Sequence, residues 1–123
     1  MRFVDTVRRE GLTDAFCGYP MGVTAENIVR QCGIGRAEQD AFALASHRKA
    51  SEATRQQRFA AEIAPLTTAS RKGSEVVSED ELIRHDASAE ALAKLRPAFE
   101  EGGTVTAGKA SGLIGMRVSS PEA

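Results

Sequence analysis

The chain has 123 residues, a formal net charge of −1 and a hydrophobic content of 41%, which is the size of a single domain. A net charge so close to zero gives no overall field that favours nucleic acid or an anionic membrane as a partner. No apolar run approaches the roughly 20 residues that a membrane-spanning helix needs. The first residues, MRFVDTVRREG, lack the apolar segment of a secretory signal. We therefore expect a cytoplasmic protein.

Two cysteines, Cys17 and Cys32, raise the question of thiol chemistry. Their spacing fits neither a zinc pattern nor a disulfide framework, so we expect reduced thiols and no metal. A cysteine paired with His47 or His85 could form an activated nucleophile. Nothing in the spacing brings a histidine near either cysteine, however, and we expect all four residues to be structural.

The apolar content is low for an independent core. Leu, Ile, Val and Phe make up about a fifth of the chain, and Trp is absent. Sequences at this level struggle to offset chain entropy, although the small net charge argues against disorder. Such a composition suits a domain that packs against something larger.

Apolar residues before position 20 predict a short helix, because Phe3, Val4 and Val7 are suitably spaced and Gly11 would stop it. Residues 12–18 mix apolar and turn residues and are expected to be irregular. Pro20 excludes a helix that continues through it from upstream.

A second helix is predicted over residues 25–32. Thr24 is a suitable N-cap, Ile28 and Val29 supply the apolar side, and Gly33 is a natural residue at the C-terminal end.

The strongest helical signal covers residues 36–63, which contain no Pro or Gly before Pro65. Projected at 100° per residue, most of the apolar side chains fall in one sector roughly 120° wide. They are Ala41, Phe42, Ala45, Ala53, Phe59, Ala60 and Ile63. Lys49 and Glu52 intrude on this sector, so we expect the middle of the helix to lie near a boundary with solvent.

The second half of the chain predicts short elements. Residues 66–68 and 75–77 have strand-like side chains on either side of a basic turn, which predicts a hairpin. Ser88 could cap a helix over residues 89–95 that ends before Pro97. Residues 104–106 form a short strand candidate. The fold class is therefore α+β and rich in helix.

A run of small residues follows, from Thr106 to Gly112. It lacks the spacing of a P-loop, but its small residues would let a ligand approach the backbone. Four basic residues could contact a phosphate group, namely Arg71, Lys72, Arg84 and Lys94. They are compatible either with anion binding or with an ordinary solvated surface.

Several separate motifs lie along residues 1–113, namely Met21–Asn27, Glu38–Ala43 with Ser46, Arg58-Phe59, Glu62-Ile63, Ile83-Arg84, Leu95–Phe99, Gly103–Gly108 and Ala110–Leu113. Together they resemble the loop domain of thiolases, and within that family the bacterial acetyl-CoA acetyltransferases most closely. The variant Pro20-Met21-Gly22 is also similar to degradative 3-ketoacyl-CoA thiolases.

The resemblance implies a coenzyme A–binding loop domain that covers the active site of a larger acyltransferase of fatty acid metabolism and lacks its αβαβα core. Met21 would touch the pantetheine arm of CoA, and Arg84 would meet its nucleotide end, where a permanent cation suits phosphate. Leu92 and Phe99 would line the apolar part of the pocket. Ala107, Gly108 and Ser111 would lie along pantetheine. Acyl-CoA and the remaining thiolase segments would be the partners, with no nucleic acid, membrane or metal.

The chain also departs from the family. Relatives often have His at Pro20, Asn at Lys109 and, in some cases, Ser at Ala91. After Leu113 the family continues Asn-Asp-Gly-Ala-Ala, whereas residues 114–123 form a divergent tail. This suggests a fragment or a truncated gene product.

The catalytic motifs of thiolases are missing from this sequence. The family needs an acyl-accepting cysteine and a histidine that activates it, and neither Cys17-Gly18 nor Cys32-Gly33 matches its cysteine motifs. We therefore assign no catalytic residue and expect the chain to be inactive alone. The alternative is a non-enzymatic helical interaction module or a degenerate gene remnant.

Overall fold

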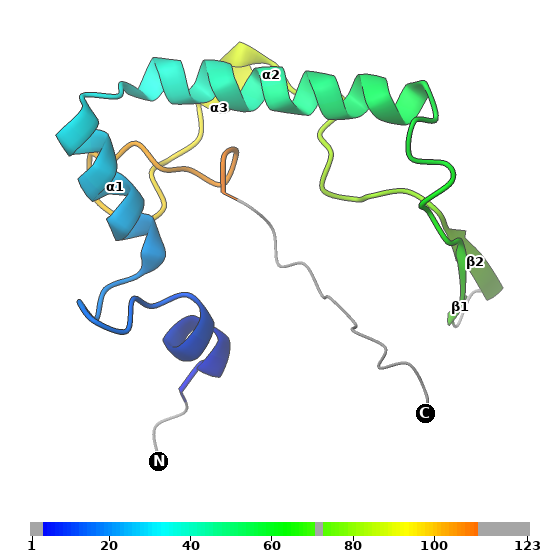
Figure 1. Ribbon diagram of the computed structural model, residues 1–123, viewed down its shortest axis with the longest axis horizontal. Helices are drawn as coiled ribbons and strands as arrows, with labels where there is room; N and C mark the ends of the chain where they lie inside the picture. The colour runs from blue at the N-terminus through cyan, green and yellow to red at the C-terminus, as the bar shows by residue number, and fades with distance from the viewer. Residues whose placement is uncertain (1–3, 71–72, 111–123) are drawn as a thin grey trace.

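The structure is a computed structural model that describes residues 4–70 and 73–110. Two helices meet at a corner, and a small hairpin lies beyond the far end of the longer one (Figure 1). The elements in chain order are η1 (a π-helix, Val7–Gly11), α1 (Met21–Cys32), α2 (Arg36–Arg55), β1 (Leu66–Ser70), β2 (Gly73–Val77) and α3 (Ala89–Ala93). The predicted α+β class is therefore confirmed. The predicted tail, residues 114–123, lies outside the described residues.

The first part of the chain agrees with the predicted short helix, because η1 ends at Gly11. The next residues are more ordered than expected. Thr13 and Pro20 form an antiparallel bridge, and the Asp14 carboxylate accepts hydrogen bonds from the backbone N–H groups of Phe16 (2.9 Å) and Cys17 (2.6 Å). These bonds lower the pKa of Asp14 and fix a turn before α1.

Helix α1 begins four residues earlier than predicted. The Pro20 carbonyl accepts hydrogen bonds from the N–H groups of Val23 (2.8 Å) and Thr24 (3.4 Å), so Pro20 takes the N-cap position. The prediction that Thr24 is the N-cap was wrong, because Thr24 already lies inside the helix. The prediction for Gly33 is confirmed: its φ of 66° is left-handed and its N–H donates to the Val29 carbonyl.

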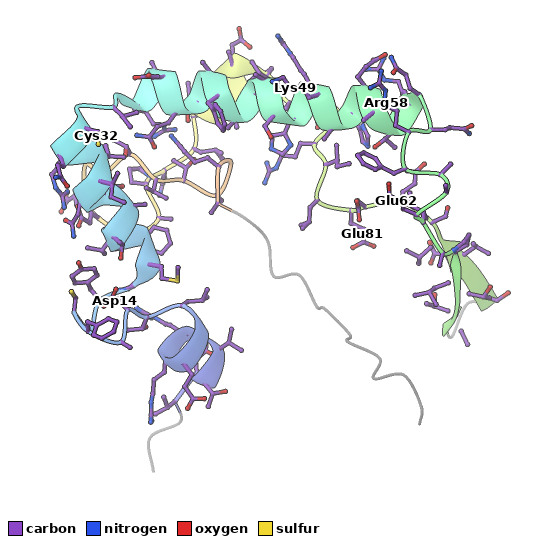
Figure 2. The ribbon with its side chains drawn as sticks, viewed as in Figure 1. Asp14, Cys32, Lys49, Arg58, Glu62 and Glu81 are labelled. Atoms are coloured by element: carbon purple, nitrogen blue, oxygen red, sulfur yellow. The ribbon has the colours of Figure 1, made fainter. Side chains whose placement is uncertain are left out.

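Helix α2 is shorter than predicted. It follows Gly35, as expected, but ends at Arg55 instead of residue 63. Gln57 has a φ of 53°, which a right-handed helix cannot continue through. Residues 56–62 form turns instead, and Figure 2 shows Arg58 at this far end of α2.

The buried side of α2 is the opposite of the predicted one. The buried residues are Asp40, Ala43, Leu44 and Ser51, and we call these four together with His47 the inner face. The predicted stripe is exposed at Ala41, Phe42 and Ala45, and Phe42 is 79% exposed. We call these three with Lys49 the outer face. The prediction was wrong because α3 and the segments flanking it pack on the inner face.

The predicted hairpin is confirmed. Strands β1 and β2 pair antiparallel, with register running from Leu66↔Val77 to Ser70↔Gly73. In Figure 2, Glu62 lies on the segment that leads from α2 to the hairpin and Glu81 on the segment that returns from it. The hairpin therefore stands apart from the small core.

Helix α3 begins as predicted, because the Ser88 hydroxyl accepts a hydrogen bond from the Ala91 N–H (3.2 Å). It ends at Ala93, slightly before the predicted residue 95. The core is small and consists of Ala43, Leu44 and Leu92, with Ala87 and Leu95 packed against it. The predicted strand 104–106 is reduced to a single bridge between Pro97 and Thr106, because the described residues around it turn rather than extend.

Candidate functional site

The segment after α3 returns to α1 and is held there by a buried carboxylate. Glu26 is 1% exposed, and its Oε1 accepts hydrogen bonds from the N–H groups of Thr104 and Val105, both at 2.7 Å. Its Oε2 accepts from the Thr104 hydroxyl at 2.8 Å. Burial by itself raises the pKa of Glu26, but these hydrogen bonds outweigh it and hold the pKa below its ordinary value.

This anchor brings two of the expected ligand contacts together. The ring of Phe99 lies directly against the backbone of Gly22, where any Cβ would overlap it. Gly22 is the neighbour of Met21 in the first turn of α1. Met21 is 56% exposed and Phe99 is 42% exposed, so both side chains remain open to a ligand. An ion pair between Arg30 and Glu100 (2.7 Å) lies on the same side of α1.

The small-residue turn packs against α3. A Cβ on Gly108 would come within 2.6 Å of both Leu92 Cδ2 and Leu95 Cδ1, so only glycine allows this close approach. Leu92 is 2% exposed and therefore lies behind the turn, while Ala107 is exposed. The structure thus joins Leu92, Ala107 and Gly108 in one place. Ser111 lies outside the described residues.

Arg84 lies on the segment between β2 and α3. Two hydrogen bonds, each involving a histidine, connect this segment to α2. The Arg84 N–H donates to His47 Nδ1 at 3.4 Å, and His85 Nδ1 is 2.8 Å from the Ser51 hydroxyl. Arg84 itself is exposed. His47 and Ser51 are separated by one helical turn, so they lie on the same side of α2 and hold consecutive residues of the segment.

An ionic cluster fastens the small-residue turn to α2. Asp40 Oδ2 accepts a hydrogen bond from Arg36 Nε at 2.7 Å, and Asp40 Oδ1 is 2.8 Å from Lys109 Nζ. Burial alone raises the pKa of Asp40, but the two cations outweigh it and lower the pKa.

Sequence reasoning missed the residues that hold the site together, namely Glu26, Arg36, Asp40 and Lys109. One signal for Glu26 was available. Gly22, Glu26, Val29 and Gly33 are spaced at i, i+4, i+7 and i+11 and therefore share one face of the helix. Small residues on either side of a carboxylate indicate a face that another segment approaches closely.

Within the described residues, no hydrogen bond joins His47 or His85 to Cys17 or Cys32. Cys17 and Cys32 are both free and exposed, and the hydrogen bonds of the two histidines go to the Arg84 backbone and Ser51. Within residues 4–70 and 73–110, no three His, Cys, Asp or Glu side chains gather closely enough to hold a metal ion. No helix in the same ranges is long and apolar enough to cross a membrane.

Comparison with known proteins connects these features to a family. The family model described as the thiolase N-terminal domain matches residues 1–114. An acetyl-CoA acetyltransferase from Rhizobium meliloti (strain 1021) is 55% identical over 112 residues, which cover 91% of this chain and 28% of that protein.

Two solved structures have the same fold in the matching part. The acetyl-CoA acetyltransferase from Syntrophomonas wolfei gives a TM-score of 0.85 at 45% identity, over 92% of this chain and 28% of that one. Human mitochondrial 3-ketoacyl-CoA thiolase gives 0.79 at 39% identity, over 85% and 27%. The chain spans less than a third of the length of these relatives. The family model and the identities together show that this chain belongs to the thiolase family.

Proposed function

We propose that residues 1–113 are the coenzyme A–binding loop domain of a thiolase-type acyl-CoA acyltransferase, an acetyl-CoA C-acetyltransferase. The complete reaction exchanges two acetyl-CoA molecules for acetoacetyl-CoA and CoA through a covalent acyl-enzyme. The observation that carries the proposal is the packing of Phe99 on Gly22 beside Met21, which unites two distant segments. The name of the Rhizobium relative, acetyl-CoA acetyltransferase, supports the substrate class.

Each proposed contact has a chemical reason. Met21 and Phe99 offer exposed apolar surface to the pantetheine arm, and exposed Arg84 offers a permanent cation to the phosphates of CoA. Exposed Ala107 is accessible to a ligand, and buried Gly108 lets the turn pack closely against Leu92 behind it. Ser111 completes the proposed set through its hydroxyl group.

Titration of CoA into the full chain by calorimetry tests the binding proposal. Arg84→Ala is expected to weaken CoA binding by about tenfold, because charge-assisted contacts to phosphate are among the stronger hydrogen bonds. The same variant should leave the affinity for pantetheine unchanged, since pantetheine lacks the nucleotide. Arg48→Ala, which removes an exposed arginine of α2, is the matched control.

Two results would count against this site. Equal CoA affinity for the wild type and Arg84→Ala would remove Arg84 from it. Absence of CoA binding by the wild type would overturn the binding proposal as a whole.

We also propose that the chain does not catalyse acyl transfer alone and works with polypeptide segments that supply the rest of a thiolase. Acyl transfer through a covalent intermediate needs a thiolate beside a general base. In the described part of the chain, neither His47 nor His85 hydrogen-bonds to a cysteine; their Nδ1 atoms contact Arg84 and Ser51. Thiolysis of acetoacetyl-CoA by the purified chain should equal a protein-free control, and turnover above that control would refute inactivity.

A further inference from the structure

Lys109 directly follows Gly108, and its ammonium group is buried. The side chain is 10% exposed, that of Asp40 is 11% exposed, and Lys109 Nζ lies 2.8 Å from Asp40 Oδ1. Apart from this ion contact, the described part of the chain offers Lys109 Nζ no hydrogen-bond partner. The ion pair is therefore what compensates the buried charge of the lysine.

Asp40 connects this lysine to two helices. Its second oxygen is held by Arg36 Nε at 2.7 Å, and Arg36 Nη2 donates to the carbonyls of Leu92 (2.8 Å) and Leu95 (3.0 Å). These carbonyls lie at and just beyond the C-terminal end of α3, and the Leu92 carbonyl also accepts a hydrogen bond from the Leu95 N–H at 3.1 Å. A single carboxylate thus links the turn to α2 and, through Arg36, to α3.

The turn itself is closed by long hydrogen bonds. The N–H groups of Lys109 and Ala110 donate to the Thr106 carbonyl at 3.2 Å each, and the Gly108 N–H donates to Thr106 Oγ1 at 3.3 Å. These distances are at or beyond the upper end of the usual range for N–H···O bonds. Three hydrogen bonds near this limit close the turn locally, and the 2.8 Å ion pair joins it to α2.

We propose that the Lys109–Asp40 ion pair is the tether that positions the Ala107–Gly108 turn for its ligand. This inference rests on the proposed function, in which the turn lies along pantetheine. Neither charged group touches the ligand, so both are positioning residues. Lys109→Met is the informative substitution, because it removes the charge while Asp40 keeps its bond to Arg36.

Amide hydrogen exchange in the full chain without ligand tests the tether directly. In Lys109→Met, the amides of residues 108–110 should exchange about tenfold faster, an effect typical of a lost contact between paired residues. Lys109→Arg keeps the charge and should restore slow exchange. Lys49→Met, which removes an exposed lysine of the outer face, should behave as the wild type.

Two exchange results would overturn the tether. One is wild-type exchange at residues 108–110 in Lys109→Met. The other is equal acceleration in α2 and the turn, because the ion pair would then support the whole fold instead of the turn.

Ligand titration completes the test. Lys109→Met should weaken CoA and pantetheine equally, by about tenfold, whereas Arg84→Ala should affect CoA alone. Faster exchange with unchanged affinity would overturn the positioning role. If the wild type binds neither ligand, the proposed function fails, and the exchange experiment still decides whether Lys109 and Asp40 hold the turn.

Discussion

The two faces of α2 differ in a way that reverses the usual expectation for an amphipathic helix. The inner face buries a carboxylate and a hydroxyl, those of Asp40 and Ser51, beside Ala43 and Leu44. The outer face leaves Phe42 79% exposed. The two stripes lie roughly 180° apart at 100° per residue. Hydrophobicity alone therefore does not decide which side of this helix is buried.

Partners for the polar groups explain the difference. On the inner face, Asp40 pairs with Arg36 and Lys109, and His47 and Ser51 bond to the segment at Arg84 and His85. Buried polar groups are tolerated when each has such a partner. The outer face has apolar side chains that the described part of the chain leaves exposed, and four changes test this contrast.

The largest effect is expected for Asp40→Asn, which leaves two cations without their shared carboxylate. Removing one side of a buried ion pair costs about 3–5 kcal/mol, a large part of the stability of a small domain. Urea unfolding followed by circular dichroism at neutral pH measures it, with exposed Glu38→Gln as the control. A loss no larger than that of the control would show that the inner face does not depend on its charges.

Acid should remove the same stabilisation without a mutation. The pKa values of Asp40 and Glu26 are lowered from their ordinary 3.8 and 4.5. Each group therefore contributes stability that is complete above its unfolded-state pKa and is lost as the pH falls through its folded-state pKa. In urea unfolding at a series of pH values, the stability difference between the wild type and Asp40→Asn should shrink below about pH 4. A difference that stays constant on acidification would exclude Asp40 as the titrating group.

A core substitution on the inner face should have a smaller effect. Leu44 is 9% exposed and packs with Leu92, so Leu44→Ala should destabilise by about 2–3 kcal/mol through lost burial and a cavity. Thermal unfolding is the measurement. An unchanged melting temperature would mean that the cluster does not form in solution.

The smallest effect is expected on the outer face. Phe42→Ser should change the free energy of unfolding by no more than about 0.5 kcal/mol, because the ring is already exposed. The same unfolding assay, run beside Leu44→Ala, gives the comparison. A loss equal to that of Leu44→Ala would show that the outer face is the buried one in solution.

Features with a local physical cause could be predicted from the sequence. The left-handed conformation of Gly33, the cap at Ser88 and the hairpin between Leu66 and Val77 each depend on a few neighbouring residues. The end of α2 could not be predicted in this way. Residues 56–63 contain no Gly or Pro, yet the helix ends before the left-handed Gln57.

The site could be predicted only in part, because its supports depend on partners far along the chain. Glu26 meets Thr104, 78 residues away, and Asp40 meets Lys109. Helical periodicity contains no information on these partners. The family resemblance named Met21 and Phe99 as separate ligand contacts, and the structure places the Phe99 ring against Gly22, the neighbour of Met21.

The buried carboxylate of Glu26 also has a consequence for the order in which the chain can fold during synthesis. Its donors, Thr104 and Val105, are 78 and 79 residues further along. At typical synthesis rates, roughly 4–16 s separate the appearance of Glu26 from that of its donors. During that interval the carboxylate stays hydrated, because burial without hydrogen bonds is unfavourable. The segment that contains Thr104 and Val105 can therefore pack against α1 only after residue 105 has been made.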